Sequence, residues 1–370
     1  MIIEVVRETD KFKDLKDTWN NLLFKSRSPS IFLTWEWLYY WWKYFKNDTT
    51  RLYILLARDE NSGQIVGIAP LCIQKNKRFG FKKIKFLGTE KVASDFLNFI
   101  INPDYESEIV TAILHYLYCQ SATWDLIEIS DLEENSSLKR LIHENNAAGR
   151  RIVEISAQLC PYILLPQNYS RLYESFNSDL QNILRRRLKK FQKNYEVSFS
   201  THTDHSEIMN KIDELFLLHD SRSNMKKRAS GFDSSFKGQD IQAFHREVAS
   251  VFLSNGWLRL YSLNCNRKAV ASLYAFKYID RMSYYQSGFD DSYQNFSPGS
   301  ILMEHCLQDA IKEGLKEFHY LRGNEEYKLK WTKDAKKTKT ILIINRTLNG
   351  NIFDAYLRVK TVVKNSFKNA

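Results

Sequence analysis

The residues with the clearest potential for chemistry form a small-residue corner before a helical pattern: Ser297, Pro298, Gly299 and Ser300. An aromatic, alternating run at 282–289 precedes this corner, and a second strand-like run at 317–321 follows the helix. Because a helix N-terminus offers unpaired N–H groups and a positive dipole end, this order can bind an anion. The alternative is an ordinary capped helix start, with Ser297 as the cap and Pro298 in the first turn.

Established nucleotide and metal motifs are absent from the sequence. Neither GxxxxGK[ST] nor GxGxxG occurs, so a kinase, NTPase or dinucleotide-binding function has no support. The five cysteines are far apart and none has a metal-site spacing with histidine, so we expect no metal. An odd number of scattered cysteines is typical of a reducing compartment, where cysteine acts as a small apolar side chain.

Four side chains are candidates for a general base: His219, Tyr285, Asp95 and Glu325. His219 ends a helical pattern before a basic segment, where a surface histidine is the alternative. Asp95 follows Ser94 in a polar loop and is equally consistent with a turn aspartate. No Ser-His-Asp order or pair of carboxylates singles out one of the four.

Candidate ligands for a substrate or an anion are also mostly basic or aromatic: Arg322, Lys328, Trp331, Gln286 and Arg185. Arg322 comes directly after a strand-like run and before Gly323, and a surface ion pair is its alternative role. Arg185 belongs to the basic cluster 185–190 of a helical segment, which is either a solvated face or a contact for phosphates, tRNA or anionic lipid.

Composition indicates a soluble globular chain with an anionic ligand. Hydrophobic residues make up 44% and charged residues 26% of the 370 residues, and the formal net charge is +11. Nucleic acid, an anionic membrane surface and a phosphorylated small molecule all fit this charge. The basic residues are spread along the chain, which suits a phosphate-bearing ligand at least as well as a DNA-binding stripe. No apolar run of about 20 residues occurs, so we expect a cytoplasmic protein without a transmembrane helix.

The elements that must position these residues are predicted by hydrophobic periodicity. The first half contains strands at 2–6, 84–87, 96–101, 124–129 and 151–156, a hairpin at 51–73, and helices at 10–25, 35–45, 106–119 and 134–145. The second half contains helices at 169–176, 180–193, 206–219, 240–254 and 298–314, strands at 197–200, 258–264, 269–279 and 338–345, and a basic loop at 221–237. A basic amphipathic helix is predicted from 352 onward.

Three features together resemble the CelD/BioF-like branch of the GNAT acyltransferase superfamily, whose relatives include the FemAB peptidyltransferases. The first is the aromatic strand 284–290 leading to the corner at 297–299. The second is the segment from Phe318 through Arg322 and Gly323 to Trp331. The third is the basic helix at 184–190, together with paired strands at 260–276. The resemblance is most specific over 176–331.

The resemblance implies an α+β fold with tandem GNAT-like lobes, in which mixed central sheets flanked by helices face each other across a cleft. It implies lobes at 1–165 and 166–350, with a basic tail at 351–370. The loop at 295–300 would hold the pyrophosphate of an acyl-CoA co-substrate, for which we expect acetyl-CoA. This loop has one glycine where family members have several, and FemAB relatives use aminoacyl-tRNA, so the donor stays open.

The implied function is acyl transfer to an amine or hydroxyl of a sugar, polysaccharide or cell-envelope precursor. Alternatives are a FemAB-like aminoacyl-tRNA-dependent peptidyltransferase and a non-catalytic binding protein in polysaccharide biosynthesis. The expected partners are therefore a small-molecule or glycan-precursor acceptor, with tRNA and an anionic membrane as further candidates and DNA excluded.

Overall fold

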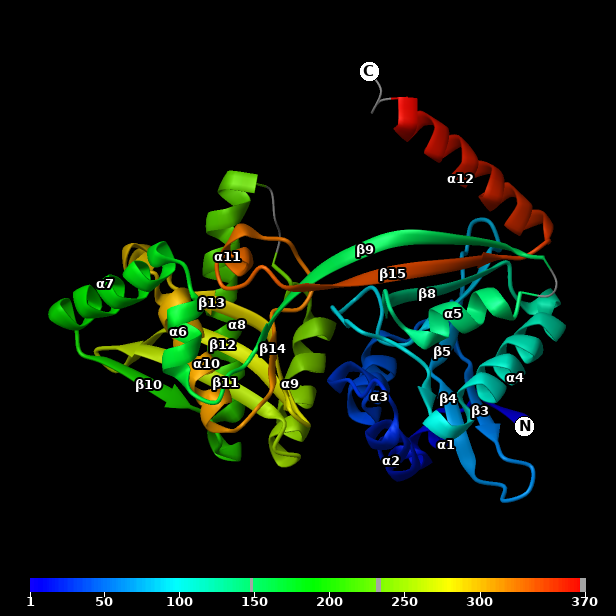
Figure 1. Cartoon of the computed structure of the whole chain (residues 1–370), viewed down its shortest axis with the longest axis horizontal. Helices are drawn as coiled ribbons and strands as arrows, with labels where there is room; N and C mark the ends of the chain where they lie inside the picture. Colours follow the sequence, from blue (N-terminus) through cyan, green and yellow to red (C-terminus); the bar gives the residue numbers. More distant parts are fainter. Residues whose placement is uncertain (147–148, 231–233, 367–370) are drawn as a thin grey trace. The chain divides into compact units, whose positions relative to one another are not determined.

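The computed structural model describes residues 1–146, 149–230 and 234–366. The chain packs as two compact units, Met1–Ala157 with Lys337–Ala370 (unit 1) and Gln158–Lys336 (unit 2) (Figure 1). Strands β9 (Arg151–Leu164) and β15 (Ala335–Ile344) carry the chain from one unit to the other and back. The functional lobes at 1–165 and 166–350 and the tail at 351–370 stay a prediction.

Unit 1 is built from short strands and helices. Its strands are β1 (Ile2–Val6), β2 (Thr50–Leu52), β3 (Ile54–Arg58), β4 (Ile65–Ala69), β5 (Leu71–Lys75), β6 (Lys82–Phe86), β7 (Ile100–Ile101) and β8 (Leu126–Glu133). Its helices are α1 (Thr9–Asp14), α2 (Lys16–Lys25), α3 (Trp35–Phe45), α4 (Glu106–Cys119), α5 (Ser137–Glu144) and α12 (Leu348–Ser366), with short 3₁₀ turns η1 (Ile31–Leu33), η2 (Pro103–Tyr105) and η3 (Ser121–Thr123).

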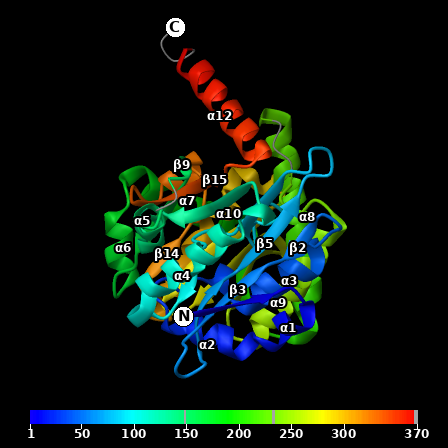
Figure 2. The same cartoon turned by 90° about the vertical axis from the view of Figure 1, so that its right-hand side faces the viewer.

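The strands of unit 1 pair in two sets. One sheet has the order β1-β3-β4-β7, and the other strands pair in the order β15-β8-β6-β5-β2, with β6 and β8 parallel. Helix α4 packs on β1, β3 and β4 (Figure 2). Its Ile109 side chain fills the space beside Gly67 of β4. Helix α3 begins as predicted, because the Thr34 hydroxyl accepts a hydrogen bond from Trp37 N–H at 3.4 Å.

Unit 2 has one sheet in the order β10-β11-β12-β13-β14-β9, antiparallel except for β13 with β14. Its further strands are β10 (Val197–Thr201), β11 (Leu258–Cys265), β12 (Lys268–Tyr278), β13 (Arg281–Phe289) and β14 (Glu317–His319). Its helices are α6 (Tyr169–Ser175), α7 (Ser178–Asn194), α8 (His205–Ser230), α9 (Gln239–Ser254), α10 (Pro298–Lys312) and α11 (Glu326–Leu329), and η4 (Asp291–Phe296) is a 3₁₀ helix.

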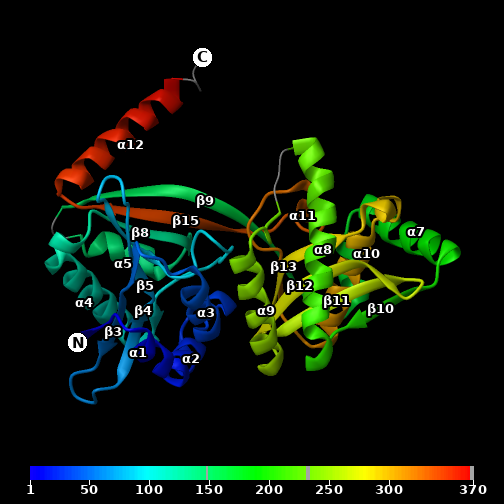
Figure 3. The ribbon, with the colours of Figure 1, turned by 180° about the vertical axis from the view of Figure 1, so that it is seen from behind.

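Helices cover both faces of the sheet of unit 2. Helices α8 and α9 lie on one face of β11–β13, and α10 lies on the other (Figures 1 and 3). The main apolar core of this unit joins α10 to the sheet through side chains such as Leu302, Cys306, Leu273 and Met282. The predicted class, mixed sheets flanked by helices, is confirmed for each unit.

Several predicted elements need correction. The hairpin at 51–73 divides between two sheets, since β3 pairs with β4 and β2 with β5, and the break falls at Pro70, which has no N–H for a ladder. Strand β9 is continuous from Arg151 through Pro161 to Leu164, whereas the sequence predicts a strand at 151–156 and a separate short extended piece at 162–165. Of the predicted strand at 96–101, only Ile100–Ile101 forms a strand. The helix at 10–25 is interrupted at Leu15.

The largest difference is in the basic loop predicted at 221–237. Helix α8 continues through this region to Ser230. Residues 220–230 contain no glycine or proline and are rich in Lys, Arg, Met and Ala, which favour helix over loop. Residues 231–233 and 367–370, parts of this loop and of the predicted tail helix, lie outside the described residues. Within the described parts of the chain, no helix is long and apolar enough to cross a membrane.

Candidate active site

The candidate site of unit 2 lies where strands β13 and β14 separate. The two strands pair in parallel only over Arg281–Ser283 with Glu317–His319, and β13 then continues to Phe289 without β14 beside it. A β-bulge gives β13 one extra residue, Tyr285, opposite the Tyr274–Ala275 step of β12. The missing neighbour leaves the second half of β13 open on one edge, where other elements can form a cavity.

A cavity of about 370 Å³ occupies this position. Its walls come from β13, η4, the start of α10, one residue of α8, and α11 with the residues after it. Its lining residues are Arg222, Tyr284, Ser287, Phe289, Gln294, Ser297, Pro298, Gly299, Ser300, Met303, Tyr327 and Trp331. The predicted anion-binding corner and Trp331 therefore lie around one cavity.

The start of α10 has an unusual local geometry. Ser297 has φ 55° and ψ 50°, a left-handed conformation, and its side chain makes no capping hydrogen bond. The prediction that Ser297 caps the helix with its hydroxyl is wrong, because a capping side chain requires an extended backbone at that residue. The Ser297 carbonyl instead accepts from Ser300 N–H at 3.0 Å and from Ile301 N–H at 3.2 Å.

These internal bonds leave few main-chain donors at the corner. Pro298 has no N–H, and the Gly299 N–H has no hydrogen-bond partner among the described residues. A Cβ added at Gly299 would meet only Phe289 Cδ1, at 3.7 Å, so the fold itself has room for a larger residue there. Gly299 therefore leaves the backbone accessible from the cavity without being required by packing.

A polar cluster that was not predicted forms another wall of the cavity. Arg222 Nη1 donates to the Ser287 carbonyl and to Ser287 Oγ, both at 2.9 Å. Ser287 Oγ lies 2.6 Å from the Tyr284 hydroxyl, which lies 3.5 Å from the Tyr327 hydroxyl. The Arg222 guanidinium also lies 5.3 Å from the centre of the Tyr327 ring, within range of a cation–π contact.

This cluster changes the acidity of the Tyr284 phenol. Burial alone would raise the pKa of Tyr284, because it disfavours the charged form. The positive charge of Arg222, the hydrogen bonds from Ser287 and Tyr327 and the charge of Lys328 outweigh burial, and the net pKa of Tyr284 is lowered. Tyr284 is thus a buried proton donor with increased acidity at the edge of the cavity.

The predicted bases do not line this cavity. His219, on α8, is buried, and its Nδ1 lies 3.0 Å from Ser234 Oγ and 3.4 Å from Ser223 Oγ. Tyr285 packs against His245, with ring centres 5.2 Å apart, in an aromatic cluster. Asp95 is fully buried in unit 1, whereas the cavity belongs to unit 2.

Glu325 and Lys328 lie together, but in an ion pair. Lys328 Nζ is 3.1 Å from Glu325 Oε2, and it also donates to the Arg322 carbonyl. Lys328 is buried, so this pair holds α11 to the loop after β14. Gly323, at φ +120°, lets the loop pass close to the carboxylate of Glu325.

The remaining predicted ligands are divided between the cavity, the sheet and the surface. Trp331 lines the cavity and packs edge-on against Phe176, with ring centres 5.4 Å apart. Gln286 lies opposite Tyr274 of β12, outside the cavity lining. Arg185 is exposed on α7, where its Nη2 donates to Asn182 Oδ1 at 3.4 Å. The roles predicted for all these residues stay predictions.

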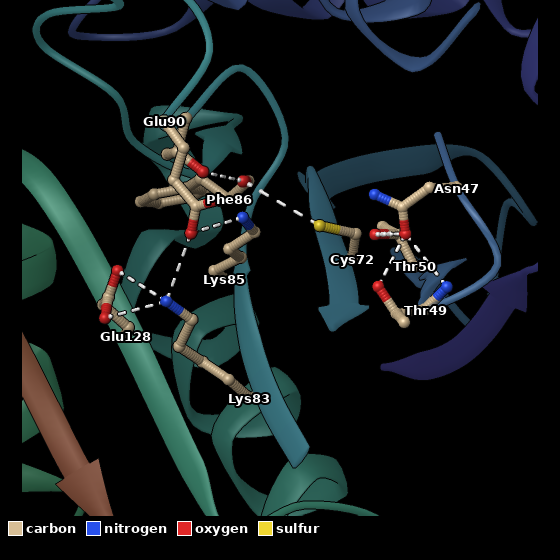
Figure 4. Close-up of polar contacts among 10 residues, drawn as sticks. Asn47, Thr49, Thr50, Cys72, Lys83, Lys85, Phe86, Glu90 and Glu128 are labelled. Atoms are coloured by element: carbon tan, nitrogen blue, oxygen red, sulfur yellow. Dashed lines mark hydrogen bonds and ion pairs between the residues drawn. The ribbon is translucent and has the colours of Figure 1, made fainter. Parts of the chain in front are cut away.

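Unit 1 contains a separate cavity of about 730 Å³, which is lined mainly by polar and charged side chains. On its wall Lys83, Glu90 and Glu128 form ion pairs, and Lys85 pairs with Glu90 as well (Figure 4). Lys83 Nζ is 3.3 Å from both Glu90 Oε1 and Glu128 Oε2, and the buried Lys85 Nζ is 2.7 Å from Glu90 Oε1. The pKa of Glu90 is lowered, since these lysines outweigh the effect of burial. Within the described residues no cluster of His, Cys, Asp or Glu could hold a metal ion in either unit.

Comparisons with known proteins agree with this architecture. Residues 178–329 match the acetyltransferase (GNAT) domain family. The fold resembles that of FemX, with a TM-score of 0.64, 11% identity, and coverage of 94% of this chain and 98% of FemX. It also resembles a conserved protein of unknown function from Bacteroides thetaiotaomicron, with a TM-score of 0.58, 13% identity and coverage of 93% and 100%.

A third similar structure is L-PGS from Bacillus licheniformis, with a TM-score of 0.55, 10% identity, and coverage of 91% of this chain and 94% of that protein. No curated protein matches the sequence. At these identities the structural likeness establishes the fold alone. Residues 178–329 therefore match the GNAT acetyltransferase domain family, in a chain that shares the fold of FemX over nearly its whole length.

Proposed function

We propose that this protein is an acyltransferase whose reaction takes place in the unit 2 cavity. The observation that carries the proposal is the position of this cavity within the GNAT domain. It opens where β13 leaves β14, and it is bounded by the start of α10 and by the Arg222–Tyr284–Tyr327 cluster. One wall can thus receive an anionic group at Gly299 N–H, while another offers the Arg222 cation and the Tyr284 hydroxyl, whose pKa is lowered.

Acyl transfer needs two functions that this cavity can supply. An acceptor amine or hydroxyl bonds to the acyl carbon, the bond from that carbon to the donor's sulfur or oxygen breaks, and one proton leaves the acceptor while one reaches the leaving group. Hydrogen-bond donors stabilise the negative charge that develops on the acyl oxygen. A side chain near its pKa donates the proton to the leaving group.

We assign the proton donor's role to Tyr284. Its lowered phenol pKa favours proton release, and Arg222 stabilises the resulting negative charge. Arg222 is held by Ser287 at 2.9 Å, so its charge is fixed at the cavity wall before a donor binds. The candidate bases chosen from the sequence, His219, Tyr285, Asp95 and Glu325, do not line this cavity and are not assigned a role in this step.

Acyl-CoA is the donor that the GNAT domain favours. Its pyrophosphate would lie at Ser297–Ser300, and the family resemblance favours an acceptor that is a sugar or a cell-envelope precursor. The second candidate is aminoacyl transfer from aminoacyl-tRNA. The corner has one unpartnered N–H among the described residues, which is little for binding a pyrophosphate, and the net charge of +11 suits a polyanion such as tRNA. Similarity of fold to FemX and L-PGS is compatible with this second candidate.

Binding of acetyl-CoA to the purified full-length protein, measured by calorimetry, tests the proposal. Gly299→Glu places a carboxylate where the donor's phosphates would lie, and we expect at least a tenfold rise in Kd, or about 1.4 kcal/mol. Gly299→Ala is the matched control, since its methyl group is accommodated at 3.7 Å from Phe289. Acetyl-CoA binding that is unchanged in Gly299→Glu would overturn this placement of the donor. Absence of CoA binding with retained aminoacyl-tRNA binding would favour the second candidate.

A further inference from the structure

A basic groove of about 640 Å³ lies on unit 2 beside helix α7. Cations from two separate segments converge there, Arg186, Arg187 and Lys190 from α7, and Lys330 from the residue that follows α11. The groove's other lining residues are Asn177, Asp179, Leu180, Asn182 and Ile183. Asp179 is the one acidic residue on its wall.

The four cations of this groove outnumber Asp179, the acidic residue on its wall. Among the described residues, no carboxylate lies within 4 Å of Arg186, Arg187, Lys190 or Lys330. By contrast, Lys83 on the wall of the unit 1 cavity lies 3.3 Å from both Glu90 and Glu128. An excess of cations in one groove produces a positive potential that favours an anionic ligand.

Helical spacing divides the basic residues of α7 into two faces. Asp179, Ile183, Arg186, Arg187 and Lys190 recur at spacings of three and four residues and line the groove. Arg185, Lys189 and Lys193 follow one another at four-residue intervals, are exposed, and lie outside the groove. The helix therefore carries a groove face and a solvent face that have similar charge but different surroundings.

The groove is fixed next to the candidate active site. Arg187 Nη1 donates to the Asn295 carbonyl, and Lys190 Nζ lies 5.3 Å from the centre of the Phe296 ring. Phe296 also stacks on Phe191 of α7, with ring centres 4.7 Å apart. Since Ser297 follows directly and lines the cavity, α7 is held against the loop that forms the cavity wall. Lys330 and Trp331 provide a second link, because the former lines the groove and the latter the cavity.

From this juxtaposition we propose that the groove binds the phosphates of a nucleotide-bearing acyl donor whose acyl end occupies the cavity. This inference rests on the proposed function and extends it from the reacting end of the donor to its nucleotide end. The shared chemistry is a phosphorylated ribose, which is present both in the 3′-phosphorylated adenosine of CoA and in the 3′ end of tRNA. Arg186 and Arg187 can bind phosphate oxygens through paired N–H groups, and Lys190 and Lys330 act as point charges.

Two full-length variants with equal charge test the groove. The groove variant is Arg186→Gln with Arg187→Gln and Lys190→Gln, and the solvent-face control is Arg185→Gln with Lys189→Gln and Lys193→Gln. Both remove three charges from α7, so a difference between them reports position and not net charge. Circular dichroism and thermal melting check that both variants keep the fold.

Two sets of probes distinguish the sources of the phosphate. Kd is measured for CoA and for dephospho-CoA, which lacks the 3′-phosphate, and for a fluorescein-labelled RNA hairpin ending in CCA, each at several salt concentrations. If CoA is the ligand, wild type and control bind it about tenfold or more tightly than dephospho-CoA, and the groove variant loses this preference. If RNA is the ligand, the plot of log binding constant against log salt concentration has a negative slope, and loss of three phosphate contacts makes this slope about 2 units less steep. Between 50 and 200 mM salt, wild type then loses about 20-fold more affinity than the groove variant.

The inference is overturned if the groove variant and the solvent-face control bind both sets of probes equally, or if the groove affects binding only to vesicles containing anionic phosphatidylglycerol. Gly299→Glu, measured in the same experiment, separates this result from the proposed function. If the groove variant weakens binding and Gly299→Glu does not, the groove is supported and the cavity assignment is contradicted. If Gly299→Glu weakens binding and the groove variant does not, the cavity assignment is supported and the groove is contradicted.

Discussion

Replacement of Gly288 by alanine should disrupt the contact between α8 and β13. A Cβ at this position would lie 2.1 Å from the backbone N of His219 and 2.3 Å from the carbonyl carbon of Leu218. Ordinary contact begins near 3.4 Å, so the two elements must separate by about 1.3 Å. Both groups that collide with the methyl are backbone atoms, which cannot rotate away. We therefore expect a cost at the upper end of the usual range for overpacking, about 3 kcal/mol.

The same displacement should also weaken the candidate active site. Arg222 lies one helical turn after His219 on α8, and its two hydrogen bonds to Ser287 of β13 are 2.9 Å long. A separation of about 1.3 Å would lengthen them beyond 3.5 Å, where a hydrogen bond is no longer made. Gly288→Ala should therefore bind acetyl-CoA or the RNA hairpin more weakly, although residue 288 itself does not line the cavity.

Native-state hydrogen exchange, read by mass spectrometry on peptides from α8 and β13, measures the expected loss of local stability. Gly314→Ala is the control, because Gly314 also lies in a strand–helix unit of this domain but its Cβ would meet nothing within 4 Å. That variant carries only the left-handed backbone cost at φ +71°, about 1–2 kcal/mol. If the free energy of hydrogen exchange for the α8 peptides of Gly288→Ala is within about 1 kcal/mol of the wild-type value, the predicted clash between α8 and β13 is refuted.

Three further predictions concern charge. In Arg222→Gln, loss of the cation should raise the pKa of Tyr284. Ultraviolet difference titration of this variant, with Tyr284→Phe in the same background as the reference, should show the Tyr284 phenol ionising at higher pH. An unchanged titration would contradict the role given to Arg222. Burial lowers the pKa of His245 to about 3, so its neutral form stabilises the fold above about pH 6.5 and this stability is lost as pH falls below that value. His245→Phe should reduce the slope of unfolding free energy between pH 4 and 6 by about 1.4 kcal/mol per unit, measured by urea unfolding, and a slope equal to wild type would count against it. In unit 1, Glu90→Gln leaves the buried Lys85 charge unpaired and should lower the unfolding free energy by about 1–3 kcal/mol, whereas Lys85→Met should change it by less than about 1 kcal/mol; equal losses would be the contrary result.

Elements whose signals are local can be predicted from the sequence. The start of α3 was predicted from Thr34, and the hydroxyl of that residue does cap the helix. Elements whose conformation depends on a distant partner cannot be predicted in this way. The break between β2 and β3 is caused by pairing with two different sheets, which no pattern within 51–59 indicates. The extension of α8 was missed because polar and basic residues were interpreted as a loop, although they are good helix formers.

The site was recognised only in part for a similar reason. The corner at 297–300 has a local signal, a small-residue loop before a helix, and it does line the cavity. Arg222, Tyr284 and Tyr327 come from α8, β13 and α11, and their spacing along the chain contains no information about their contact. An aromatic strand and an arginine were visible in the sequence, but only the bulge and the close approach at Gly288 bring them together.

The geometry of the corner at 297–300 also explains why basic side chains nearby should be needed to bind the phosphates of a donor. A helix N-terminus binds an anion through its unpaired N–H groups, but here the Ser297 carbonyl accepts from Ser300 and Ile301, and Pro298 has no N–H. Gly299 alone offers an unpartnered donor in the first turn within the described residues. A phosphate-bearing donor would then depend on cations nearby for most of its binding energy, since charge-assisted hydrogen bonds are about twice as strong as neutral ones. Arg187 contacts the loop directly before this turn, and for this reason the basic face of α7 should contribute more to donor binding than the corner itself.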